Sequence, residues 1–174
     1  MSEFQLETVT GEPFGFIRLE ATLPEMPRTI GEGFSKLGEL FGRADAGMAG
    51  APYAHYVSLE QGKAVFDLGF PIASADAERL RAAGAQIGKT PDGRVLKGIH
   101  LGPYDTVNQT YDSMGIDLKR RHLKGTPDMW ERYYSPPGTP PDKTRTEVIW
   151  PIASYLMGRW LAGRSTGLRP GDVF

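Results

Sequence analysis

The pentapeptide Phe70-Pro71-Ile72-Ala73-Ser74 returns later in the chain as Trp150-Pro151-Ile152-Ala153-Ser154. Both copies place an aromatic residue directly before Pro-Ile-Ala-Ser. A motif that recurs within a chain of 174 residues indicates an internal duplication. The two copies therefore divide the sequence into two similar halves.

A helical pattern also occurs twice, once upstream of each pentapeptide. Its apolar positions are separated by four, three and four residues, which is the spacing of one face of an α-helix. Two such units, each too small to bury its own apolar face, are expected to pack into one domain with pseudo-twofold symmetry. The apolar positions are Ile30, Phe34, Leu37 and Phe41 in the first half, and Val107, Tyr111, Met114 and Leu118 in the second.

Each half predicts the order strand, helix, strand, strand. Thr29 is expected to cap the first helix, and a short helical linker over 76–83 is expected to end at Gly84, between the halves. Extended segments are recognised by β-branched and aromatic residues without helical periodicity. The expected strands are 4–9, 13–19, 53–59, 64–72, 94–101, 129–135 and 145–152, and the expected long helices are 29–41 and 105–122.

These elements predict an α+β domain over residues 1–154, with internal repeats at about 4–75 and 85–154. Antiparallel sheet surfaces are expected to form a central ligand cleft at the seam between the copies. Residues 155–174 form a C-terminal extension with one apolar helical stripe, which we expect either to fold back on the domain or to form a dimer contact. The stripe comprises Tyr155, Leu156, Trp160 and Leu161.

Composition and charge exclude several classes of protein. The chain has 20 basic and 21 acidic residues, so no overall field attracts nucleic acid or an anionic membrane. Apolar residues make up 40% of the chain, a globular balance, and the absence of cysteine excludes disulfides and thiolate chemistry. The acidic amino terminus is unlike a secretory signal, and no apolar run approaches a membrane span, so a cytoplasmic protein is expected.

Motifs for metal, cofactor or nucleophilic chemistry are missing. His55, His100 and His122 lack the close spacing of zinc ligands, so we expect no metal and no cofactor. Neither Gly-x-Ser-x-Gly nor a phosphate-binding loop occurs. The basic run 119–124 lies at a predicted helix carboxyl end, where cations complement the dipole, so it is interpreted as a solvated face and not as a nucleic-acid site.

Four short motifs follow one another in the second half. They are Pro91-Asp92-Gly93-Arg94, His100-Leu101-Gly102-Pro103-Tyr104-Asp105, Trp130-Glu131-Arg132-Tyr133 and Arg145-Thr146-Glu147-Val148-Ile149-Trp150-Pro151. In this order and spacing they resemble the GyrI-like (gyrase-inhibitor-like) effector-binding domain, over about residues 4–153. That domain is also the drug-sensing part of some MerR-type and AraC-type regulators. The resemblance implies a duplicated strand-helix-strand-strand fold with a concave sheet surface as its ligand cleft.

The resemblance places the carboxylate of Glu131 on the floor of this cleft. Strand alternation puts Glu131 and Tyr133 on one face and Trp130 on the other. With Trp130 packed under the helices, Glu131 would face the cleft. The alternative is an exposed Glu131 that forms surface pairs beside Arg132.

The same resemblance assigns Glu147 and Ile149 to the cleft wall. Family members often carry an aromatic residue where this chain has Ile149, so the expected pocket has one stacking surface fewer. The alternative for Glu147 is a surface ion pair with Arg145.

Two further tyrosines are candidates. Tyr56 is the counterpart of Glu131 in the first half and would face the same cleft, or else pack in the core. Tyr104 follows a strand-to-helix corner, where it would point into the cleft or serve the turn. The candidate ligand-binding residues are Tyr56, Tyr104, Glu131, Tyr133, Glu147 and Ile149.

A carboxylate walled by aromatic rings attracts a lipophilic cation through its charge and through the ring faces. The sequence therefore predicts a domain that binds small hydrophobic or cationic, drug-like or toxin-like molecules, with its oligomeric state open. The resemblance also permits a hydrolase that adds water to cyclopropane-containing toxic compounds, with Glu131 and Glu147 as candidate catalytic carboxylates. A third alternative, suggested by the family name, is inhibition of a topoisomerase by protein contact.

Overall fold

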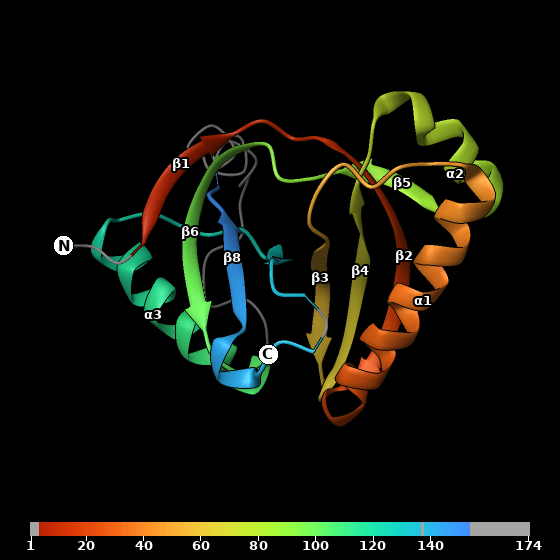
Figure 1. Cartoon of the computed structure of the whole chain (residues 1–174). Helices are drawn as coiled ribbons and strands as arrows, with labels where there is room; N and C mark the ends of the chain where they lie inside the picture. Colours follow the sequence, from red (N-terminus) through yellow and green to blue (C-terminus); the bar gives the residue numbers. More distant parts are fainter. Residues whose placement is uncertain (1–3, 137, 154–174) are drawn as a thin grey trace, which may run out of the picture.

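The computed structural model describes residues 4–136 and 138–153. Within these ranges the chain forms one curled, antiparallel, eight-stranded sheet (Figure 1). The strands are β1 (Gln5–Val9), β2 (Pro13–Thr22), β3 (Tyr53–Glu60), β4 (Lys63–Pro71), β5 (Gln86–Lys89), β6 (Gly93–Leu101), β7 (Met129–Tyr133) and β8 (Arg145–Pro151). They are ordered β1-β6-β8-β7-β3-β4-β2-β5, so β7 and β3 join the two halves of the chain.

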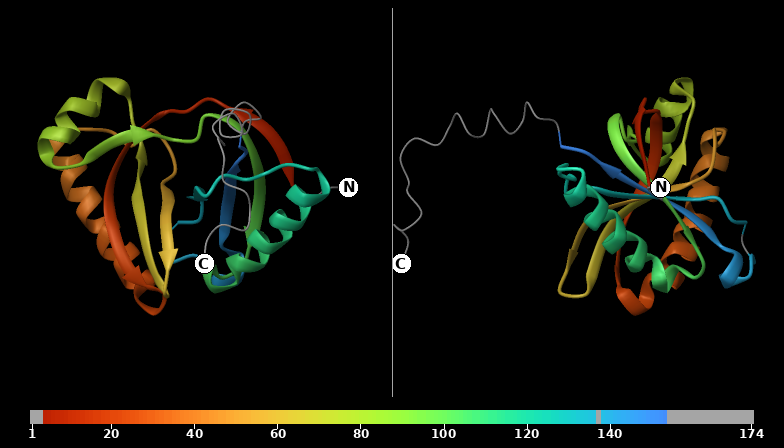
Figure 2. Two further views of the ribbon diagram at one scale, coloured as in Figure 1. Left: turned by 180° about the vertical axis from the view of Figure 1, so that it is seen from behind. Right: turned by 90° about the vertical axis from the view of Figure 1, so that its left-hand side faces the viewer.

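Helices α1 and α3 pack against different parts of the sheet, as the views from behind and from the side show (Figure 2). Helix α2 follows β4 and contacts α1. Four short 3₁₀ turns connect the elements in the described part of the chain. The helices are α1 (Met26–Ala44), α2 (Ala77–Ala83) and α3 (Val107–Arg120), and the turns are η1 (Leu23–Glu25), η2 (Ser74–Asp76), η3 (Tyr104–Thr106) and η4 (Pro141–Lys143).

The predicted order of strands and helices is confirmed, with two differences. Strand β5 was not predicted, because four residues are too few to show a period; it pairs with the start of β2. The cap at Thr29 is wrong, since α1 begins at Met26. The backbone N–H and the hydroxyl of Thr22 both donate to the Glu25 carboxylate, at 3.1 and 2.6 Å. These bonds start turn η1, which continues directly into α1 and leaves Thr29 inside the helix.

The two helical stripes are confirmed as core faces. Leu37 and Phe41 of α1 are buried against strand residues that include Phe66, in a cluster that we call the α1 core. Met114 and Leu118 of α3 are buried in a second cluster, the α3 core. Each helix therefore covers its own part of one sheet face. The α1 core includes Ile17, Leu37, Leu40, Phe41, Ala54, Phe66 and Leu68, and the α3 core contains Phe4, Leu96, Met114, Leu118 and Val148.

A third cluster lies on the opposite face of the sheet. It contains Phe14, Tyr53, Val95, Trp130 and Ile149. The Trp130 ring lies 5.5 Å from Phe14 and 6.0 Å from Tyr53, centroid to centroid. Trp130 therefore does not pack under the helices, so the condition on which Glu131 would face the cleft is not met. Aromatic contacts across the middle strands offer Trp130 more partners on the face that carries no long helix.

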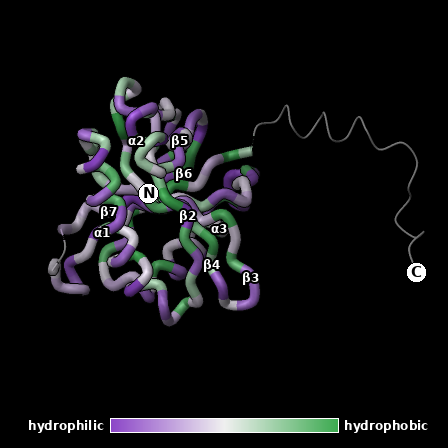
Figure 3. Tube along the Cα trace, turned by 90° about the vertical axis from the view of Figure 1, so that its right-hand side faces the viewer, coloured by the Kyte–Doolittle hydropathy of each residue, from purple (hydrophilic) through white to green (hydrophobic). Residues whose placement is uncertain are grey.

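None of the helices in residues 4–136 and 138–153 has both the length and the apolar character needed to cross a bilayer. Hydrophilic and hydrophobic residues are interspersed along the trace (Figure 3). The predicted apolar stripe in the C-terminal extension lies outside the described residues. Fold-back on the domain and a dimer contact both stay predictions.

Candidate functional site

Glu131 lies where the two halves of the sheet meet. On β7 it is paired with Ala54 of β3 on one side and with Val148 of β8 on the other. Paired residues of antiparallel strands share a sheet face. Because Ala54 belongs to the α1 core and Val148 to the α3 core, Glu131 points to the helix-bearing face between them.

Three tyrosine hydroxyls surround the carboxylate. Tyr133 donates to Oε2 and Tyr111 of α3 donates to Oε1, each at 2.8 Å. The Tyr56 hydroxyl lies 3.5 Å from Oε2 and 3.2 Å from the Tyr133 hydroxyl. The carboxylate is thus held by groups from both halves of the chain. Glu131 is 4% exposed, which excludes the alternative of a surface residue.

Tyr104 forms the outer edge of this group. Its ring meets the Tyr133 ring edge to face, with centroids 5.6 Å apart. Tyr104 is 48% exposed, whereas Tyr133 is buried. We call Glu131 with Tyr56, Tyr104, Tyr111 and Tyr133 the Glu131 cluster. Tyr104 connects this buried cluster to solvent.

Burial dominates the electrostatics of the cluster. It raises the pKa of the Glu131 carboxyl, and the hydrogen bonds from Tyr133 and Tyr111 oppose that rise. Burial, reinforced by the Glu131 charge, also raises the pKa of Tyr111 and Tyr133 well above the usual range, so both remain donors at neutral pH. Within the described residues, no Lys, Arg or His nitrogen lies within 4.0 Å of the Glu131 carboxylate. The site therefore holds an ionisable acid that has no ion-pair contact among the described residues, and His100 acts on it only from a distance, lowering the pKa of its carboxyl.

This arrangement predicts how stability depends on pH. Since the pKa of Glu131 is raised in the folded state, the native protein binds more protons than the unfolded chain between the ordinary carboxyl pKa and the raised one. Stability conferred by the protonated acid should be lost as pH rises through that window. We expect Glu131→Gln, which cannot ionise, to melt at a higher temperature than the wild type at pH 7, and the difference to shrink near pH 4.

The control is Glu39→Gln, which alters an exposed carboxylate on α1. Thermal denaturation of the three proteins across pH 4–8 checks the expectation. A Glu131→Gln difference that stays constant over this range would contradict it.

The structure brings most of the predicted site residues together and adds one. Tyr56, Tyr104 and Tyr133 adjoin Glu131, as the sequence predicted. Tyr111 was predicted only as part of the apolar helix stripe. The sequence did contain one signal for this role: Tyr111 carries a hydroxyl in an otherwise apolar stripe, and a buried tyrosine hydroxyl usually has a hydrogen-bond partner.

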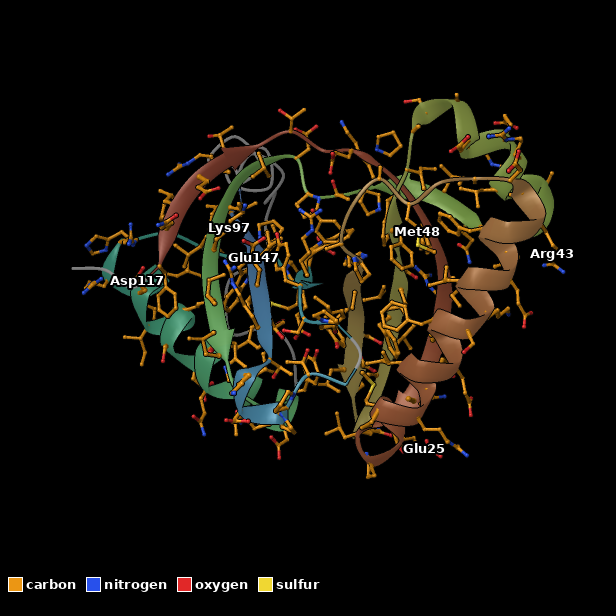
Figure 4. All side chains as sticks on the ribbon, viewed as in Figure 1. Glu25, Arg43, Met48, Lys97, Asp117 and Glu147 are labelled. Carbon is orange, nitrogen blue, oxygen red and sulfur yellow. The ribbon has the colours of Figure 1, made fainter. Side chains whose placement is uncertain are left out.

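Glu147 and Ile149 do not share this site. Glu147 is paired with Arg132, and Ile149 with Trp130, so both side chains lie on the opposite sheet face. The expectation that they wall the same cleft as Glu131 is wrong, because β8 is aligned with β7 so that Val148 stands beside Glu131. Figure 4 labels Glu147 next to Lys97, whose Nζ is 3.9 Å from its Oε1. Within the described residues no ion pair joins Glu147 to Arg145.

His100 organises the corner that leads to Tyr104. Its Nε2 is 2.9 Å from the Pro103 carbonyl oxygen, and its Nδ1 is 2.9 Å from the Thr110 hydroxyl. These contacts fix the turn before α3 and leave no ring nitrogen for a metal. No group of three acidic or histidine side chains able to hold a metal occurs in the part of the chain that the structure describes.

The chain is thus an α+β domain in which a buried carboxylate, bonded to tyrosine hydroxyls, lies at the seam of a curled antiparallel sheet. The family model described as the GyrI-like small molecule binding domain matches residues 2–153. The chain belongs to this family, and the resemblance inferred from its motifs is confirmed. No curated protein sequence matches the chain.

Several solved structures share the fold. A hydrolase from Listeria innocua is 12% identical with a TM-score of 0.65, and the match covers 87% of this chain and 92% of that one. SAV2435 bound to tetraphenylphosphonium is 15% identical with a TM-score of 0.60, covering 87% and 94%. EcmrR in a complex with DNA is 13% identical with a TM-score of 0.70, covering 88% and 59%. At these identities the likeness shows the fold alone.

Proposed function

We propose that this protein binds lipophilic cations, with the Glu131 cluster as the floor of the binding cleft. The observation that carries the proposal is the buried Glu131 carboxylate, which has hydroxyl donors but no cationic nitrogen within 4.0 Å among the described residues. Burying an acid is costly unless the charge is compensated. A bound cation would supply that compensation and make ligand binding the reason for keeping the acid.

The tyrosine rings strengthen the preference for a cation. Aromatic faces attract cations beyond simple charge pairing. Tyr104 and Tyr133 present two rings at right angles beside the carboxylate, and the half-exposed Tyr104 is the group that would move to admit a ligand. The structure of SAV2435 with tetraphenylphosphonium, a lipophilic cation, supports the choice of ligand class.

We also propose that the domain over residues 1–154 arose by internal duplication with pseudo-twofold symmetry. The element order strand, helix, strand, strand occurs from β2 to β4 and again from β6 to β8. Outward from the central pair, the strands follow as β4-β2-β5 on one side and β8-β6-β1 on the other. This matched order supports a cleft at the seam, where Tyr56 and Glu131 approach from opposite halves.

The test is a calorimetric titration with tetraphenylphosphonium, with uncharged triphenylphosphine oxide as the matched control. We expect a dissociation constant in the micromolar range for the cation, which corresponds to a binding free energy of about −8 kcal/mol. The neutral compound should bind much more weakly. Equal binding of the two compounds would overturn the role of charge.

A hydrolase is the second candidate, favoured by the raised pKa of Glu131, which suits a general base working near neutral pH. The fold shared with a hydrolase from Listeria innocua supports it. Glu131 would take a proton from water as the water oxygen bonds to one ring carbon and the strained C–C bond breaks, and Glu131 would then return that proton to the carbon released by the ring opening, while Tyr133 and Tyr104 hold the substrate. Glu147 has no part in this proposal, because it lies on the other sheet face.

Incubation with an electrophilic cyclopropane compound should then give the water adduct catalytically. Glu131→Ala is expected to abolish turnover, and Glu147→Ala to retain it, as product analysis by mass spectrometry would show. Product at no more than the uncatalysed rate would leave binding as the function. Topoisomerase inhibition and a cytoplasmic location stay predictions from sequence.

A further inference from the structure

A pocket of about 260 Å³ opens on the sheet face opposite to Glu131. Its inner wall is formed by Tyr53 of β3, Arg132 of β7, Ile149 of β8 and Lys97 of β6. The strand register places these four on one face, since Tyr53 pairs with Arg132 and Lys97 pairs with Ile149. Segments that follow β1 and β5 complete the rim. The pocket is therefore built from distant parts of the chain around a central arginine.

Arg132 brings a positive charge into this pocket without a direct ion pair among the described residues, although the carboxylate of its cross-strand neighbour Glu147 lies on the same sheet face. No carboxylate of the described residues lies within 4.0 Å of its guanidinium nitrogens. Its Nε is fully buried and has no hydrogen-bond partner among those residues. Buried polar groups are nearly always paired, and a guanidinium matches a carboxylate through two parallel hydrogen bonds. Arg132 thus has donors to offer an acidic ligand.

Aromatic and apolar groups stand next to this charge. The Arg132 guanidinium carbon lies 4.6 Å from the Tyr53 ring centroid and 5.3 Å from that of Tyr134, so the guanidinium is close to both rings. Burial raises the pKa of Tyr53 to about 12, so its phenol remains a donor at neutral pH. Ile149 is buried at the pocket wall and offers an apolar surface. An anion with a small apolar body would find both kinds of contact.

The other charged groups of the pocket leave Arg132 as the principal anion receptor. Lys97 is 3.2 Å from Glu7 and 3.9 Å from Glu147, so its charge is largely matched. Glu12 also lines the pocket, but it is exposed to solvent at the rim. Its repulsion of an anion is therefore screened by water.

We propose that this pocket is a second ligand site, which binds a small aromatic carboxylate through Arg132 and Tyr53. The volume lies just below the usual range for ligand sites, which limits the ligand to about one ring. The site is independent of the proposed cation site, because successive residues of a strand point to opposite faces. The Glu131 side chain thus lies on one face of the sheet and the Arg132 side chain on the other.

Benzoate is the probe, with benzyl alcohol as its uncharged analogue and acetate as the anion without a ring. Titration of the full-length protein, followed by ¹H–¹⁵N NMR, should show saturable shifts with benzoate that are confined to the pocket residues. Each control compound should bind at least tenfold more weakly. Equal binding of benzoate and acetate, or shifts scattered over the surface, would overturn the proposal.

Arg132→Gln should weaken benzoate binding at least tenfold. The matched control is Arg145→Gln, which removes an exposed arginine that also lies over the Tyr134 ring, 5.4 Å from its centroid, but does not line the pocket. Unchanged affinity in Arg132→Gln would overturn the site. If that variant fails to fold, Tyr53→Phe keeps the ring and removes the hydroxyl, and a severalfold loss is then expected.

The two ligand sites are tested separately by exchanging probes. Arg132→Gln should still bind tetraphenylphosphonium as the wild type does, and Glu131→Gln should still bind benzoate. Failure of cation binding would therefore leave the Arg132 pocket standing, and failure of benzoate binding would leave the cation site standing. Competition between the two probes would contradict their placement on opposite faces.

Discussion

Replacement of Glu131 by Gln is expected to weaken binding of tetraphenylphosphonium by about 1–3 kcal/mol, the cost of losing a charge-assisted partner. Gln preserves the shape of the side chain and can still form hydrogen bonds to Tyr111 and Tyr133. The loss of binding free energy therefore measures the contribution of the Glu131 charge. Calorimetry of the wild type and the variant at the same ionic strength measures it.

Glu147→Gln provides the matched control, since it removes a carboxylate from the opposite sheet face and should leave cation affinity unchanged. Equal losses in the two variants would indicate a general effect of net charge and would contradict the assignment of Glu131. The same Glu131→Gln protein should be more stable at neutral pH, because it no longer buries an ionisable acid. Weaker binding with higher stability is the pattern expected of an acid kept for a ligand.

Replacement of Gly69 by Ala is expected to destabilise the fold by about 3 kcal/mol or more. Gly69 lies in β4 and pairs with Phe16 of β2. An added Cβ would overlap the carbonyl oxygen of Gly15 and lie 2.7 Å from the Cα of Phe16. Both are backbone atoms of a paired strand, so relief requires β2 and β4 to separate. Urea denaturation at constant pH would measure the change.

Gly38→Ala makes the same chemical change where space is free. Apart from its chain neighbours and the backbone of its own helix, no atom of the described residues lies within 4 Å of the Cβ it would add on the exposed surface of α1. Alanine is favoured over glycine inside a helix, so this variant should gain about 0.5–1 kcal/mol. Similar effects of the two substitutions would show that the close approach of β2 and β4 is not what excludes a side chain at Gly69.

Local periodicity determined much of the fold in advance. The stripes that begin at Ile30 and Val107 predicted α1 and α3 and the side on which each is buried, because a helix face depends only on residues within a few turns. Alternation along a single strand likewise predicted that Glu131 and Tyr133 share a face. Short β5 has too few residues to carry such a pattern.

The order of the motifs in the sequence is sufficient to identify the family and to select Glu131. Several short motifs at fixed spacings are specific enough to indicate a family, whereas a single residue is not. The helix stripe in the sequence included Tyr111. Its hydrogen bond to Glu131 could not be predicted, because it joins α3 to β7 and depends on how the helix packs against the sheet.

Only the tertiary structure decided which residues of neighbouring strands share a sheet face. Alternation fixes the relative faces of residues within β7 or within β8, but the register between these strands is set by pairing along their whole length, and a shift of one residue exchanges the faces. The pairing of Glu131 with Val148 sends Glu147 and Ile149 to the opposite face. The same register places Arg132 beside Tyr53 and opens a pocket among six segments of the chain. The sequence by itself thus determined the elements, the family and the acid, whereas long-range strand pairing decided which side chains meet.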